Sequence, residues 1–206
     1  MAMMKRHQRI LRLTLRALLM VIVLLQTMIP WLGNLPLGLM SITILPVTIA
    51  IIAVAFGPAE GAIMGGVWGI VTLLRAFVYP TSALAPIIFT NPVIAIVPRV
   101  LVGVVAGYAF RELVKLLSPS VSAAIAGLLA SLTNTVLVLG LIYLFFNHNH
   151  RVTAAYGQTN GHLASALLAI VTTNGLVEAA VALILTGLIA PAVWKVVKKL
   201  TQQPGK

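Results

Sequence analysis

The chain contains no cysteine and only three acidic residues among its 206. The absence of cysteine excludes disulfides, thiolate metal sites and cysteine nucleophiles. Charged residues make up 8% of the chain and hydrophobic residues 60%, and the mean hydropathy is +1.08. These values exclude an ordinary soluble domain and indicate an integral membrane protein that crosses the bilayer several times.

Apolar segments separated by short loops predict an all-α membrane protein, a bundle of six transmembrane helices that forms a single domain over residues 1–206. The first segment has basic flanks but no small-residue cleavage site after it, so we expect it to be a retained helix. No internal repeat and no long soluble insertion is visible, which leaves no room for a nucleotide-binding domain. The predicted spans are residues 13–29, 37–56, 61–79, 93–116, 121–146 and 163–197.

The basic residues are distributed unevenly across these spans. The net charge is +11. With six spans, every lysine and arginine outside the membrane falls on one side except Arg151, an eleven-to-one division. The positive-inside rule therefore predicts that both termini are cytoplasmic. The same distribution favours a topology signal over nucleic-acid binding.

Two features of the spans predict local structure. Pro46 lies inside the second predicted span, where a proline removes a backbone hydrogen bond and usually kinks the helix. Gly57, Gly61, Gly65 and Gly69 recur every four residues into the third span. Such a ridge of small residues lets a neighbouring helix approach closely.

Ionisable and amide side chains within the spans indicate a functional site. An ionisable group inside a membrane costs roughly 2.5 to 3.5 kcal/mol and usually faces a bundle interior or a watery cavity. Asn174 and Glu178 share one helical face near the middle of the last span. Arg75 lies about one turn inside the outer end of the third span, Arg99 about two turns into the fourth, and Asn134 at mid-depth in the fifth.

Helical rise places these side chains in one layer between the outer surface and the midplane. Arg75 lies about 6 Å, Arg99 about 10 Å, Asn174 about 16 Å, Asn134 about 18 Å and Glu178 about 22 Å below the outer surface. Two arginines above a group of amides suit a small, elongated anion, because guanidinium binds carboxylate in a bidentate fork. The alternative is an internal ion pair between Arg99 and Glu178 that ties helices together.

Other chemistries have weaker support. His148 and His150 lack a third ligand, which favours a solvated loop over a metal site. No GxSxG motif is present. No ring or repeat of selectivity residues indicates a channel. A proton-driven carrier that titrates Glu178 is physically possible.

These features together resemble the substrate-binding S component of an energy-coupling factor (ECF) vitamin transporter. The resemblance covers almost the whole chain and includes the 57–61 turn and the closing 174–178 helix. Within that superfamily the chain is most similar to the pantothenate type. The motifs that carry this similarity are at residues 91–93, 98–103, 132–137 and 173–175.

The resemblance implies a division of labour in the cell membrane. The S component binds the vitamin from outside, a transmembrane T component and two cytoplasmic ATPases supply the energy, and ATP is used by those partners, so this chain needs no cofactor and is not an enzyme. The outer loops gate such sites. Family members commonly dock the T component through an alanine-xxx-alanine ridge on the first span, where this chain has Leu13, Ala17 and Val21.

We therefore expect a six-helix S component for a small anionic vitamin, pantothenate first. The alternatives are another water-soluble vitamin (riboflavin, pyridoxine, folate or a thiamine precursor), a stand-alone proton-coupled carrier that uses Glu178, and a structural subunit without a ligand. Arg75 and Arg99 would attract a carboxylate, the three asparagines would bind amide and hydroxyl groups, and Glu178 would orient Arg99 or accept a hydroxyl. The candidate binding residues are Arg75, Asn91, Arg99, Asn134, Asn174 and Glu178.

Overall fold

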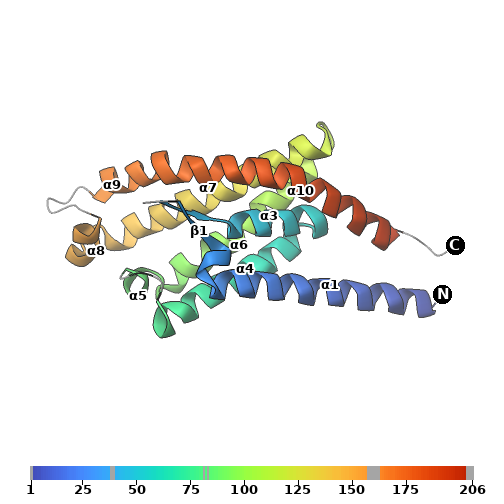
Figure 1. Cartoon of the computed structure of the whole chain (residues 1–206), viewed down its shortest axis with the longest axis horizontal. Helices are drawn as coiled ribbons and strands as arrows, with labels where there is room; N and C mark the ends of the chain where they lie inside the picture. The colour runs from blue at the N-terminus through green and yellow to red at the C-terminus, as the bar shows by residue number, and fades with distance from the viewer. Residues whose placement is uncertain (1, 38–39, 81, 83, 157–162, 203–206) are drawn as a thin grey trace.

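The computed structural model describes residues 2–37, 40–80, 82, 84–156 and 163–202, and most of this part of the chain is helical (Figure 1). The elements in chain order are α1 (Ala2–Met28), α2 (Pro30–Gly33), β1 (Asn34–Leu37), β2 (Met40–Thr43), α3 (Leu45–Phe56), α4 (Pro58–Val78), α5 (Ala85–Ile88), α6 (Pro92–Leu113), α7 (Pro119–Phe146), α8 (His150–Ala155), α9 (Leu163–Ile170), the π-helix η1 (Val171–Gly175) and α10 (Leu176–Gln202).

The long helices run side by side along the long axis of the molecule (Figure 1). Within the described residues, four helices are long and apolar enough to cross a membrane: α4, α6, α7 and the continuous helix Leu163–Leu200. The apolar stretches Leu13–Met28 and Leu45–Phe56 are shorter. The start of α1 and the end of α10 lie at one end of the molecule, and α5, α8 and α9 lie at the other. This architecture is that of a helical membrane protein.

The prediction of one kinked helix over residues 37–56 is wrong. The strands β1 and β2 form an antiparallel hairpin, with Asn34 opposite Thr43, and α3 begins only at Leu45. Pro46 lies in the first turn of α3. A proline is well tolerated there, because the first backbone N–H groups of a helix have no intrahelical partner. Pro46 therefore starts a helix instead of bending one.

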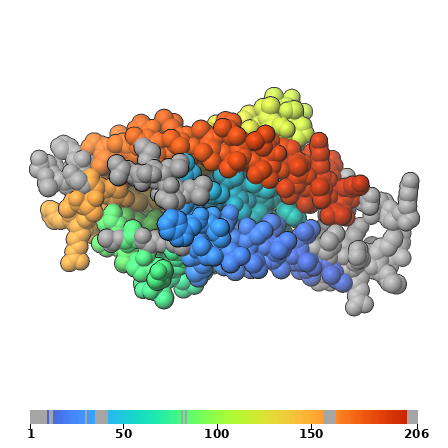
Figure 2. Space-filling model, in the orientation of Figure 1, coloured from blue at the N-terminus to red at the C-terminus, as the bar shows by residue number. Residues whose placement is uncertain are grey.

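Helix α3 is the centre of the bundle. Nine of its twelve residues are buried, and in Figure 2 it is visible between α1 and α10. Its length of about 18 Å is well short of the roughly 30 Å hydrocarbon core of a bilayer. Non-helical backbone is tolerated at membrane depth where it lies inside protein or lines a cavity.

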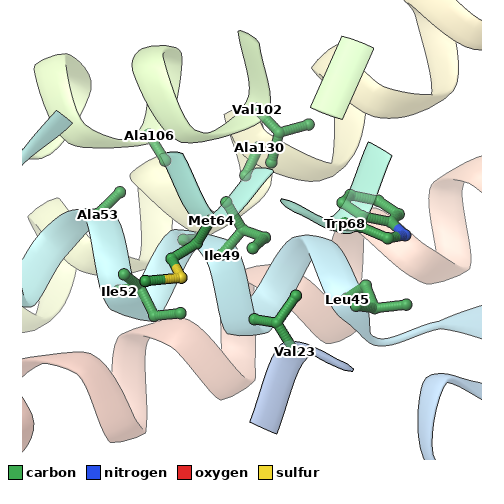
Figure 3. Packing of buried hydrophobic residues seen from close by; sticks show 11 residues of the cluster. Val23, Leu45, Ile49, Ile52, Ala53, Met64, Trp68, Val102, Ala106 and Ala130 are labelled. Atoms are coloured by element: carbon green, nitrogen blue, oxygen red, sulfur yellow. The ribbon is translucent and has the colours of Figure 1, made fainter. Parts of the chain in front are cut away.

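Apolar side chains from five helices fill the main core. The cluster in Figure 3 joins α1, α3, α4, α6 and α7 and includes Ile49, Met64 and Val102. The predicted glycine ridge packs α4 against α6, because Gly61 lies against Gly103, Gly65 against the backbone of Arg99 and Gly69 against Ala95 and Ile96. Gly57 is not part of that contact. It has a φ of +102° in the turn between α3 and α4, a conformation that favours glycine.

The last span is interrupted by η1, a π-helical turn of five residues between α9 and α10. A π-helical turn inserts an extra residue into an α-helix and often occurs at functional sites. Here it coincides with the polar stretch that contains Asn174, and the hydroxyls of Thr172 and Thr173 donate to the carbonyls of preceding residues. The irregular turn therefore lies where the sequence predicts the site.

Candidate functional site

A cavity of about 280 Å³ lies inside the bundle, between the hairpin and the long helices. Its walls come from the end of α1, both strands of the hairpin, α3, α4, α5, α6, α7, α9, η1 and α10. The volume lies just below the roughly 300 to 1,000 Å³ typical of small-molecule sites. The cavity is therefore suited to a small solute.

Five of the six predicted site residues line this cavity, namely Arg75, Arg99, Asn134, Asn174 and Glu178. Asn91 is not among the lining residues. It is the N-cap of α6, where its Oδ1 accepts a hydrogen bond of 2.9 Å from the backbone N–H of Val93. This bond satisfies a helix-end donor, so Asn91 has a structural role at the start of the helix that carries Arg99.

Arg99 is held by its own helix. Pro98 has no backbone N–H, so the carbonyl of Ile94 loses its usual helical donor. The Nη1 atom of Arg99 donates to that carbonyl at 2.6 Å. The guanidinium also lies 5.1 Å from the ring centres of both Trp68 and Phe89. Arg99 is only 5% exposed, and its Nε has no hydrogen-bond partner, so a fixed cation is left with an unused donor.

Arg75 has a comparable arrangement at the end of α1. Its Nη1 donates to the carbonyl of Thr27, which lies in the last turn of α1. Carbonyls in the last turn have no intrahelical donor, and a cation is favourable near that end of the helix dipole. The second guanidinium nitrogen, Nη2, is buried without a partner. Arg75 thus also keeps a donor for another group.

Glu178 does not pair with Arg99. Its Oε1 accepts a 2.7 Å hydrogen bond from the backbone N–H of Thr43 in β2. In the part of the chain that the structure describes, the ion pairs are Arg16–Glu60 and Glu112–Lys115, both outside the cavity. The interpretation of Arg99 and Glu178 as an internal ion pair is therefore wrong. Each of them binds a backbone group instead.

Unpaired polar atoms gather at the cavity. Among the described residues, seven have a buried side-chain nitrogen or oxygen without a partner, and five of these line the cavity. The donors belong to Arg75 and Arg99, and the oxygen acceptors to Gln26, Asn134 and Asn174. A buried polar group left unpaired costs about 1 to 3 kcal/mol. A ligand with matching acceptors and donors would remove that cost.

Several lining residues were not predicted. Trp68 and Thr72 precede Arg75 by seven and three residues on α4, and both line the cavity. This helical spacing places all three on one face, a signal that was available in the sequence. Phe89 follows α5 and Asn34 begins β1. Nothing in the sequence around these two residues indicates that their side chains face the cavity.

A cavity with two fixed cations inside an apolar helix bundle is typical of one class of protein, a multi-pass membrane protein that binds a small polar solute. The chain matches the family described as "ECF transporter, substrate-specific component" over residues 11–190, and it belongs to that family. This match confirms the prediction that the chain is a substrate-binding component of an ECF transporter. The chain is a transport component of the cell membrane.

Two curated relatives are similar over most of their length. The chain is 36% identical to the pantothenate transporter PanT of Leuconostoc mesenteroides over 187 residues, which cover 87% of this chain and 88% of that protein. It is 34% identical to the pantothenic acid transporter PanT of Lactococcus lactis over 165 residues, which cover 74% of this chain and 78% of the relative.

Proposed function

We propose that this chain is the pantothenate-binding component of an ECF importer. The observation that carries the proposal is the presence of both unpaired donors and unpaired acceptors around the cavity, with guanidinium donors on Arg75 and Arg99 and amide oxygens on Asn134 and Asn174. Pantothenate has a carboxylate at one end, an amide in the middle and two hydroxyl groups at the other end. Two relatives whose names specify pantothenate support the same substrate.

The charge of the cavity also favours a monoanion. Arg75 and Arg99 contribute two positive charges and Glu178 one negative charge, so the ionisable groups that line the cavity sum to +1. Pantothenate carries one negative charge. Folate carries two, thiamine is a cation, and riboflavin and pyridoxine have no net charge. Charge complementarity chiefly determines which solutes are rejected, because an unmatched buried charge is costly.

The arrangement predicts one orientation of the substrate. The carboxylate lies toward Arg75 and Arg99, where bidentate contact with guanidinium is possible. The amide and hydroxyl groups lie toward Asn134 and Asn174, whose oxygens accept hydrogen bonds. Asn91 is left out of this set because its side chain caps α6.

The proposal extends to topology and partners. Six crossings, with the hairpin and α3 together as the second, put both termini in the cytoplasm in accordance with the positive-inside rule. A T component and two cytoplasmic ATPases would supply the energy, as the family resemblance implies. The T component would dock on α1, where Leu13 and Val21 are 54% and 49% exposed.

The test is a thermal-shift measurement on the purified chain in detergent with pantothenate, riboflavin, pyridoxine, folate and thiamine in parallel. A ligand present at 1,000 times its Kd stabilises the folded protein by about 4.1 kcal/mol, which is readily detected. We expect a large increase in Tm with pantothenate alone.

Each other outcome has a definite meaning. A shift with a different vitamin would overturn the substrate assignment. No shift with any vitamin would overturn the proposal that the cavity is a vitamin site. The matched control is Glu112→Gln, which changes an exposed carboxylate outside the cavity and should leave the pantothenate shift unchanged.

A further inference from the structure

We propose that Glu178 is a positioning residue that holds strand β2 in the wall of the cavity. The proposal depends on the proposed function only for the identity of the cavity as the substrate site. It differs from the sequence-based roles for Glu178, which were to orient Arg99 or to accept a ligand hydroxyl. The carboxylate instead joins two segments that are 135 residues apart in the chain.

The geometry of the hairpin explains why β2 needs a partner here. The backbone N–H of Ile44 donates to the carbonyl of Gly33 at 2.8 Å, and Thr43 lies opposite Asn34. In an antiparallel pair, bonded and non-bonded positions alternate. The N–H of Thr43 therefore points away from β1. A two-stranded hairpin offers it no second neighbour, and an unpaired N–H is unfavourable inside a membrane protein.

Glu178 supplies the missing acceptor. It is 6% exposed and lies two residues into the α10 segment that follows η1. Its Oε1 accepts the Thr43 N–H at 2.7 Å. One side chain of α10 therefore joins the hairpin to a long helix.

This contact shapes the substrate site. Asn34 and Thr43, the opposed residues of the hairpin, both line the cavity. If Glu178 could not accept the Thr43 N–H, that group would need water, and β2 would move away from α10 to obtain it. The wall formed by Asn34 and Thr43 would then be displaced even when no ligand is present. A residue that only contacts the ligand would have no such effect on the empty protein.

The experiment uses the absence of cysteine from the chain. Ile42 precedes Thr43 on β2 and is 4% exposed, so Ile42→Cys introduces one protected thiol. Its reaction rate with a soluble maleimide is measured on the full-length purified protein without pantothenate. We expect Glu178→Ala in this background to react about tenfold faster or more, since a lost hydrogen bond to a charged group changes an equilibrium by at least that factor. Glu178→Gln retains an oxygen acceptor and should react close to the parent rate.

The matched control is Glu112→Ala, which removes a carboxylate paired only with Lys115 on the surface and should not change the rate. Amide hydrogen exchange in α4 and α6 shows whether each variant is folded. Where Glu178→Ala does not fold, Glu178→Leu fills the same volume and repeats the test. If Glu178→Ala or Glu178→Leu is folded and reacts at the parent rate, the proposal is wrong. It is also wrong if Glu178→Gln reacts as fast as Glu178→Ala. Because no pantothenate is present, these results are independent of the thermal-shift test of the substrate.

Discussion

The three ionisable side chains of the cavity each bind a backbone group that has no partner in its own helix or hairpin. Arg99 binds the carbonyl exposed by Pro98, Arg75 a carbonyl at the end of α1, and Glu178 an N–H at the edge of β2. Each side chain is thereby oriented before any ligand arrives. Preorganisation of this kind raises affinity because fewer rotamers are lost on binding.

Arg99 should determine recognition of the carboxylate. We expect Arg99→Gln to weaken pantothenate binding at least tenfold, because removing one member of a buried charge pair costs about 2 to 5 kcal/mol. Arg99→Lys should also bind weakly, since an ammonium group lacks the planar fork and the aromatic stacking. Calorimetry with pantothenate and with pantothenol, in which an alcohol replaces the carboxylate, measures the effect. The preference for pantothenate should largely disappear in Arg99→Gln.

Pro98 offers a control that separates binding from folding. Pro98→Ala restores the N–H that the carbonyl of Ile94 lacks, so the double variant Pro98→Ala, Arg99→Gln should recover part of the stability lost in Arg99→Gln. It should not recover the affinity for pantothenate. If binding returned together with stability, the role of Arg99 would be structural.

At the scale of elements, the contact between α4 and α6 positions Arg99. A Cβ at Gly65 would collide with the backbone carbonyl of Arg99, whereas a Cβ at Gly66 would meet only Val100 at an ordinary 3.6 Å. Gly65→Ala should therefore destabilise the protein by about 1 to 3 kcal/mol and weaken pantothenate binding.

The adjacent Gly66→Ala is the matched control and should be neutral or slightly stabilising, since alanine is favoured over glycine in a helix interior by about 0.5 to 1 kcal/mol. Thermal unfolding and calorimetry on both variants check the pair. Equal effects at the two positions would mean that general helix propensity, and not the α4–α6 contact, accounts for the result.

The sequence predicts α4, α6 and α7 well, because each is a long apolar run with turn residues at both ends. Each begins within three residues of the position expected from the sequence. The hairpin could not be predicted in the same way. Residues 37–56 are largely apolar, and a segment buried inside a bundle has a similar composition whether it is helix or strand. The π-helical turn was missed for a related reason, since it is an insertion within an unbroken helical pattern.

The site was predictable as far as it depends on membrane burial. Arg75, Arg99, Asn134, Asn174 and Glu178 stand out because polar groups are rare in apolar spans, and all five line the cavity. The partners of Arg75, Arg99 and Glu178 were not predictable, because they are backbone atoms. Only three-dimensional structure shows that the carbonyl of Ile94 or the N–H of Thr43 is free.

Across the molecule as a whole, the polar residues of the cavity and the exposed basic residues lie in different parts of the long helices. The cavity is lined by residues at the end of α1, at the end of α4 and in η1, whereas exposed Arg111 and Lys199 lie in the last turns of α6 and α10. Under the proposed topology the positive-inside rule puts these last turns in the cytoplasm, so we expect the solute to enter the cavity from the opposite, exterior side.

The crossing made by the hairpin and α3 is the least regular part of this topology, and it can be tested directly. Trp31 and Ala59 flank it and are exposed, and Trp31 is 72% exposed. In the cysteine-free chain, we expect Trp31→Cys to react with a membrane-impermeant maleimide in intact cells, and Ala59→Cys to react only after permeabilisation. The physical reason is that α3 alone is about 18 Å long and spans the bilayer only with the hairpin above it. With six crossings Lys199→Cys should behave as Ala59→Cys does, because both residues then lie on the cytoplasmic side. Labelling of both flanking cysteines in intact cells would show that the hairpin and α3 do not cross, and that the bundle has five crossings.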